Sequence, residues 1–126
     1  MIDHVSIPVS DLGRSAAFYD ALLAPLGMRR IAERPRTIGF GKRYPELWLN
    51  LREGTTQPEG SGHHVCLRCR SEDAVRAFHA AALANGGGTD GKPGPRRAEM
   101  TTYYGAFILD PDGNKIEEAT FPPPAD

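Results

Sequence analysis

The sequence lacks the features of several broad protein classes. Its 126 residues hold 15 lysines and arginines against 16 aspartates and glutamates, so the formal net charge is −1. No stretch approaches the roughly 20 apolar residues of a membrane-spanning helix, and the first six residues have neither the basic start nor the apolar run of a secretory signal. These absences argue against nucleic-acid and membrane partners. We therefore expect a cytoplasmic protein with a single domain over residues 1–126.

Cysteine is also scarce. Cys66 and Cys69 are the two cysteines, and they form a C-x-x-C, a spacing found in redox and zinc sites. They lie in an alternating, strand-like run. In a strand, side chains three residues apart point to opposite faces, and their Cα atoms are roughly 10 Å apart. That separation is too long for a disulfide, and the sequence has no second C-x-x-C to complete a zinc site. We expect neither a redox nor a zinc role for this pair.

What the sequence does contain is an internal repeat. When the chain is shifted by 60 positions, residues 4–27 align without a gap on residues 64–87, with eight identities in 24 positions. His4 falls on His64 and Phe18 on Phe78. A fixed internal period is the signature of repeated structural units. The chain therefore consists of two modules, residues 1–52 (module 1) and 62–121 (module 2), joined by a polar, glycine-rich linker at 53–61.

Hydrophobic patterning predicts the same element order in both modules. In module 1 we expect a strand at 2–9, a helix at 12–24 that packs through Phe18 and Leu22, and strands at 28–33, 36–41 and 46–51. In module 2 we expect a strand at 64–69, a helix capped by Ser71 and running to about Ala84, and strands near 88–92 and at 101–109 and 115–120. Module 2 also contains a predicted loop at 92–97 and a tight turn at 110–114, and it is followed by a frayed tail at 122–124. The predicted fold is α+β, with two βαβββ modules whose curved sheets leave a concave face.

Strand parity places three potential metal ligands on that concave face. Val5 and Ile7 face the helix in module 1, which leaves His4 on the opposite side, and the same alternation exposes His64 and Glu117 in module 2. Two imidazoles and one carboxylate form a ligand set for Zn, Ni, Mn or Fe, with positions left open for substrate. The alternative is a pair of strand-terminal histidines bonded to backbone. The repeat favours the metal site, because both histidines occupy the same place in their modules.

At these residues the chain resembles the vicinal oxygen chelate superfamily, which includes glyoxalase I, bleomycin-resistance proteins, fosfomycin-resistance thiol transferases and extradiol dioxygenases. The resemblance covers nearly the whole chain and is carried by residues 2–5, 11–12 and 18–19 in module 1, and by 64–65, 77–79 and 110–117 in module 2. The most specific part is the run Asp110-Pro-Asp-Gly-Asn-Lys-Ile-Glu117. The stretches 93–96 and 103–107 resemble a group of small bacterial glyoxalase-like proteins.

The resemblance implies paired modules around a divalent metal, commonly in a homodimer, with a small-molecule substrate bound through two vicinal oxygens. His4, His64 and Glu117 match the ligand positions, and Glu117 is then also catalytic. We expect a metal-dependent enzyme of the lyase, isomerase, thiol-transferase or dioxygenase type. The alternative is a protein that sequesters an antibiotic or another small molecule without catalysis, as bleomycin-resistance proteins do.

Five further residues are candidates for the expected concave face or its border, and each also has an ordinary structural interpretation. Trp48, Tyr103 and Tyr104 are candidate substrate contacts or ordinary sheet packing. Arg96 is a candidate for recognising an anionic substrate or a solvated loop arginine, and Glu99 is a candidate catalytic base or an exposed acid. Where glyoxalase I has a second acid ligand, Trp48 or Leu49 falls nearest here. The segment 97–102 lacks the histidine usual in the small bacterial group, and Asn114 stands where histidine is frequent.

Overall fold

The computed structural model describes residues 1–122, so Pro123 and Pro124 of the predicted tail lie outside the described part. Module 1 comprises β1 (Val5–Val9), α1 (Leu12–Leu23), a short 3-10 helix η1 (Ala24–Leu26), β2 (Arg29–Arg34), β3 (Thr37–Gly41) and β4 (Leu47–Leu51). Module 2 comprises β5 (Val65–Arg68), α2 (Glu72–Ala84), β6 (Gly88–Arg97), β7 (Thr102–Leu109) and β8 (Lys115–Thr120). The predicted α+β fold with two βαβββ modules is confirmed.

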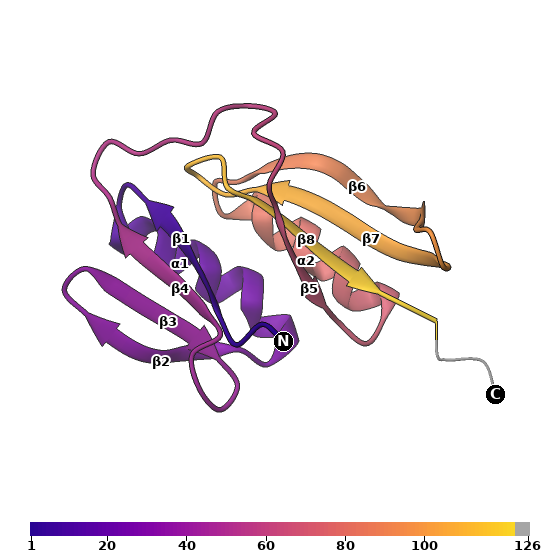
Figure 1. Ribbon diagram of the computed structural model, residues 1–126, viewed down its shortest axis with the longest axis horizontal. Coiled ribbons are helices and arrows are strands. Elements are labelled where there is room, and N and C mark those ends of the chain that lie inside the picture. The colour runs from indigo at the N-terminus through magenta and orange to yellow at the C-terminus, as the bar shows by residue number, and fades with distance from the viewer. Residues whose placement is uncertain (123–126) are drawn as a thin grey trace.

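The two modules have the same sheet topology. Their strand orders are β1-β4-β3-β2 and β5-β8-β7-β6, with the first pair of each sheet parallel and the others antiparallel. Figure 1 shows the sheets next to each other, with the edge strands β1 and β5 between them and both helices behind. Val5 pairs with Leu47 in one sheet and Val65 with Ile116 in the other. In this register Trp48 of module 1 occupies the position of Glu117 in module 2.

The helices form where the sequence supplies caps and an apolar stripe. Asp11 accepts a hydrogen bond from the backbone N–H of Arg14, and Ser71 accepts one from Ala74, so each side chain caps its helix. Phe18 and Phe78 are almost completely buried, at 1% and 0% exposure, as the repeat predicts. The helices contact each other, and residues from both modules share one apolar core.

Strand β6 is the main departure from the sequence prediction. The predicted loop at 92–97 is wrong, because β6 continues through these residues to Arg97 despite Pro93 and Pro95. Proline is tolerated here because β6 is an edge strand, where a missing N–H costs no ladder bond on the open side. The pairing with β7 shifts register on both sides of Gly91, which has a φ of 156°. The first strand begins at Val5, three residues later than predicted, the other strand boundaries move by about one residue, and the first helix ends at Leu23, before η1.

The turn at 110–114 joins the two modules. Asp112 accepts hydrogen bonds from the backbone N–H of Ser10 at 2.9 Å and from the Arg14 guanidinium at 3.1 Å. The Asn114 amide donates to the backbone carbonyl of Pro8 at 2.8 Å. This turn directly precedes β8, so its contacts with module 1 also fix the start of the strand that carries Glu117.

None of the helices in the described residues is long and apolar enough to span a membrane.

Candidate metal and substrate site

His64 and Glu117 lie side by side on the concave face of the module 2 sheet. The His64 Nε2 atom is 3.1 Å from Glu117 Oε1. The Glu117 side chain is only 5% exposed, whereas that of His64 is 40% exposed, so the carboxylate is fixed in the sheet and the imidazole borders solvent. The predicted pairing of these two residues on one face is therefore observed.

Tyr103 holds the other oxygen of Glu117. Its hydroxyl donates to Glu117 Oε2 at 2.8 Å. Burial, together with the hydrogen bond to Glu117, raises the pKa of Tyr103 to about 12, so the phenol remains a donor at neutral pH. Gly105 leaves the space for this contact, because a Cβ there would lie 3.0 Å from the Tyr103 ring and 3.3 Å from Glu117 Oε2. Tyr103, a predicted substrate contact, thus orients the carboxylate.

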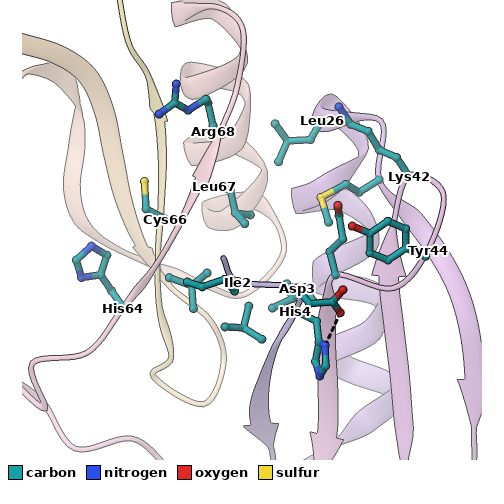
Figure 2. A pocket seen from close by; sticks show the side chains of 15 residues that line it. Ile2, Asp3, His4, Leu26, Lys42, Tyr44, His64, Cys66, Leu67 and Arg68 are labelled. Atoms are coloured by element: carbon teal, nitrogen blue, oxygen red, sulfur yellow. Dashed lines mark hydrogen bonds and ion pairs between the residues drawn. The ribbon is translucent and has the colours of Figure 1, made fainter.

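His4 lies apart from this pair. It precedes β1 in module 1, its side chain is 52% exposed, and its Nδ1 atom is 2.7 Å from Asp3 Oδ1. Figure 2 shows His4 beside Asp3 on one side of a hollow and His64 on the other, with Ile2 between them. Among residues 1–122, no three His, Cys, Asp or Glu side chains are grouped so that they could hold a metal. A single chain therefore brings together two of the three predicted ligands.

The donors that are present fit a divalent metal. Metal–nitrogen and metal–oxygen bonds of about 2.0–2.2 Å place neighbouring ligand atoms roughly 3 Å apart, close to the 3.1 Å between His64 and Glu117. Asp3 binds Nδ1 of His4 and leaves Nε2 available, and a carboxylate in this position commonly fixes the ring orientation of a metal-binding histidine. The sequence did not predict that Asp3 and Tyr103 contact these ligands, although it placed Tyr103 among the candidate substrate contacts. The adjacency of Asp3 to His4 was the one available signal.

Cys66 also faces this site. It pairs with Glu117 across β5 and β8 and is exposed, whereas Cys69 is buried on the opposite side. Although the residue is exposed, its thiol is partly desolvated against the sheet, and this desolvation, followed by the charge of Glu117, raises the pKa of Cys66 to about 12. Both cysteines are free thiols, in agreement with the parity argument against a disulfide.

On the module 1 sheet, Trp48 lines a separate hollow of about 530 Å³ that also includes His4. Its ring lies against Gly39, where a Cβ would approach ring carbon Cζ3 to 2.9 Å. The Arg34 guanidinium lies over the ring, 5.6 Å from its centre. The position of Trp48 matches that of Glu117, so module 1 offers an indole where module 2 has a carboxylate.

The remaining predicted residues lie in different places. Arg96 is on the concave face of module 2, stacked over Phe107 at 5.3 Å and donating to the Lys92 carbonyl. Tyr104 lies against the opposite, helix-covered side, where Arg76 of α2 donates to its hydroxyl at 3.2 Å. Glu99 is exposed in the turn between β6 and β7.

Comparison with known proteins fixes the family. A sequence model of the glyoxalase/bleomycin resistance protein/dioxygenase superfamily matches residues 1–117. The chain belongs to this superfamily. Its members include proteins of different function, so membership establishes the fold rather than a reaction.

Individual relatives illustrate this range. The chain is 33% identical to a lactoylglutathione lyase from Haemophilus influenzae, over 90% of this chain and 87% of the relative. It is 33% identical to a solved glyoxalase/bleomycin resistance protein from Albidiferax ferrireducens, with a TM-score of 0.82 and coverage of 94% and 98%. A fosfomycin resistance protein from Mesorhizobium loti shares the fold, with a TM-score of 0.68 at 19% identity and coverage of 97% and 92%.

Proposed function

We propose that this protein is a divalent-metal-dependent enzyme that binds a small molecule through two neighbouring oxygen atoms. The observation that carries the proposal is the His64–Glu117 pair, whose facing atoms are 3.1 Å apart on the concave sheet. Tyr103 holds the free carboxylate oxygen and so limits rotation of Glu117. A Zn, Ni, Mn or Fe ion bound here would act as a Lewis acid toward the substrate oxygens.

The third ligand in this proposal is His4 of a second copy of the chain. In one chain, His4 and His64 are on opposite sides of a hollow of about 540 Å³. The hollow has an apolar part formed by side chains such as Val5, Leu47 and Val65, and Ile2 at its border is 82% exposed. In the described sheets β1 and β5 each pair on one side only, which leaves edges that a second copy would cover. We therefore propose a homodimer with two shared sites.

Trp48 and Glu117 determine the proposed ligand set and the group available for proton transfer. Trp48 stands where module 1 would otherwise supply a second carboxylate, so the proposed ligand set contains two histidines and one acid. Such a set leaves coordination positions open for substrate. Glu117 is the acid next to those positions, and its carboxylate is the proposed group for moving a substrate proton. The relative from Haemophilus influenzae makes a lyase or isomerase reaction the first class to assay.

Metal analysis tests the proposal directly. Purified protein, stripped with EDTA and dialysed against each of the four metals, should bind about one ion per chain. His64→Ala should reduce binding at least tenfold, because it removes a ligand of the best-formed pair. His79→Ala is the matched control, since His79 lies on α2 and bonds Thr89 away from the concave face. Wild-type protein that binds none of the metals would refute the enzyme proposal.

A second candidate function is sequestration of a small molecule without a metal. The observation that favours it is the hollow around Trp48, which has the size of a small-ligand site within one chain. This function predicts ligand binding that is unchanged by EDTA and by His64→Ala. Metal binding separates the two functions, because only the enzyme proposal requires that wild-type protein bind an ion and that His64→Ala lose it.

A further inference from the structure

Arg34 is placed at the Trp48 hollow with its charge uncompensated. Its guanidinium carbon lies over the Trp48 ring, 5.6 Å from the ring centre, a cation–π contact that uses none of the N–H groups as hydrogen-bond donors to an acid. The N–H groups at its edge remain able to donate. Arg34 lines the same hollow as His4, the proposed metal ligand of module 1.

Two neighbouring arginines on and beside the β2–β3 hairpin have acidic partners, which Arg34 lacks in the described part of the chain. Arg30 pairs with Asp20 at 2.6 Å and with Glu33 at 3.1 Å, and Arg36 pairs with Glu53 at 3.4 Å. For Arg34, no salt bridge exists within residues 1–122. Arg29, at the start of β2, has no salt bridge in this part of the chain either, but it does not line the hollow, whereas Arg34 does.

Other side chains in the hollow define the charge and shape of its ligand. Asp3 is the acid that lines it, and Asp3 is engaged by His4. The Asn50 side-chain oxygen lies 2.7 Å from the Thr37 hydroxyl, which leaves the Asn50 amide N–H groups as the donors of that side chain. One unpaired guanidinium and one amide donor match a singly charged, planar acceptor. A carboxylate has this charge and geometry.

We propose that Arg34, with Asn50, binds the carboxylate of a small organic acid on the module 1 face. The placement of this carboxylate next to the metal-bound part of a substrate rests on the proposed function; the carboxylate site itself requires no metal. The site makes Arg34 a specificity-determining residue, because it distinguishes an acid from its neutral amide.

The single tryptophan provides a local measurement of binding. Trp48 contributes one indole N–H signal to a ¹H–¹⁵N spectrum, so ligand binding beside it is read from that signal. EDTA-treated protein is titrated with benzoate and, separately, with benzamide, a neutral analogue of similar shape. We expect the signal to shift saturably with benzoate and the apparent Kd for benzoate to be at least tenfold lower than that for benzamide.

Two variants make the test specific to Arg34. Arg34→Gln should raise the Kd for benzoate at least fivefold, to a value near that for benzamide. Arg36→Gln, which removes the nearby paired arginine, should leave the Kd within twofold of wild type. Equal binding of benzoate and benzamide, or unchanged benzoate binding by Arg34→Gln, would overturn the proposal. Because the titration uses metal-free protein, a failed metal analysis would refute the enzyme proposal and leave this result intact.

Discussion

The Tyr19 hydroxyl donates a hydrogen bond to Asp110 at 2.8 Å, and this buried contact connects the helix of module 1 to the closing turn of module 2. The two residues are 91 positions apart in the chain. Burial first, and then the charge of Asp110, raises the pKa of Tyr19 well above its ordinary value, so the phenol keeps its proton. The same Asp110 oxygen accepts from the Asn114 amide. Module 1 therefore helps to hold the turn that leads into β8.

Removing that hydroxyl should loosen the connection between the modules. We expect Tyr19→Phe to lower the free energy of unfolding by about 1.5–3 kcal/mol, because a buried carboxylate loses a donor while the ring packing is kept. Urea denaturation followed by circular dichroism measures the change. Tyr44→Phe is the control, since Tyr44 is 51% exposed and should change stability by less than about 0.5 kcal/mol. Equal stability of Tyr19→Phe and wild type would contradict the connecting role.

The two repeat-related phenylalanines should contribute similarly to stability. Phe18 and Phe78 are both almost fully buried in the shared core. Each change to alanine should cost about 3–5 kcal/mol, from lost burial and the cavity that remains. Leu83→Ala on α2 serves as the control, because Leu83 is 49% exposed. A small loss at one phenylalanine and a large loss at the other would mean that the modules do not share the core equally.

Glu118 should make stability depend on pH. Its side chain is fully buried on the side of β8 opposite Glu117, and within residues 1–122 neither of its oxygens has a hydrogen-bond partner. Burial raises the pKa of Glu118 from 4.5 to about 7, so the folded protein keeps a proton that the unfolded chain releases. The stabilisation is complete below pH 4.5 and is lost as the pH rises toward 7.

Denaturation of EDTA-treated protein between pH 4.5 and 8 tests this effect. Glu118 should contribute a decline on the order of 2–3 kcal/mol across that interval. Glu118→Gln should remove this component, whereas Glu99→Gln, at an exposed position, should retain it. Identical pH profiles for Glu118→Gln and wild type would show that the carboxyl does not titrate in the folded state.

The position of Glu117 should depend on the missing side chain at residue 105. An added Cβ at Gly105 would crowd Tyr103 and Glu117, at 3.0 and 3.3 Å. Gly105→Ala should therefore weaken the proposed metal binding by roughly tenfold, as expected when the support of a ligand is disturbed. Gly94→Ala is a matched control on the paired strand, because a Cβ at Gly94 meets no atom of the described residues within 4 Å. Calorimetric titration with Zn²⁺ compares the two variants, and equal affinities would argue against this dependence.

The sequence predicted the features that follow from repetition and alternation. The shift of 60 residues identified Phe18 and Phe78 as equivalent core residues, and strand parity placed His64 and Glu117 on one face. Both signals are local, because side-chain direction in a strand repeats every two residues. The order of helices and strands follows from the same periodicity.

Other features depend on contacts that no local pattern encodes. Pro93 and Pro95 indicated a loop, but the edge position of β6 made a strand possible. The role of Asp112 could not be predicted, because its partner Ser10 lies 102 residues away. Likewise, the support of Glu117 by Tyr103 requires the register of β7 on β8, which parity alone does not set.

The separation of His4 from the His64–Glu117 pair has a consequence for mixtures of defective chains. If each site takes His4 from one copy and the pair from the other, a dimer of one His4→Ala chain and one His64→Ala chain contains one doubly defective site and one intact site. Two inactive proteins, unfolded together and refolded, would then complement each other. About half of the dimers formed at random would be mixed, so such a sample should regain about a quarter of the wild-type metal sites.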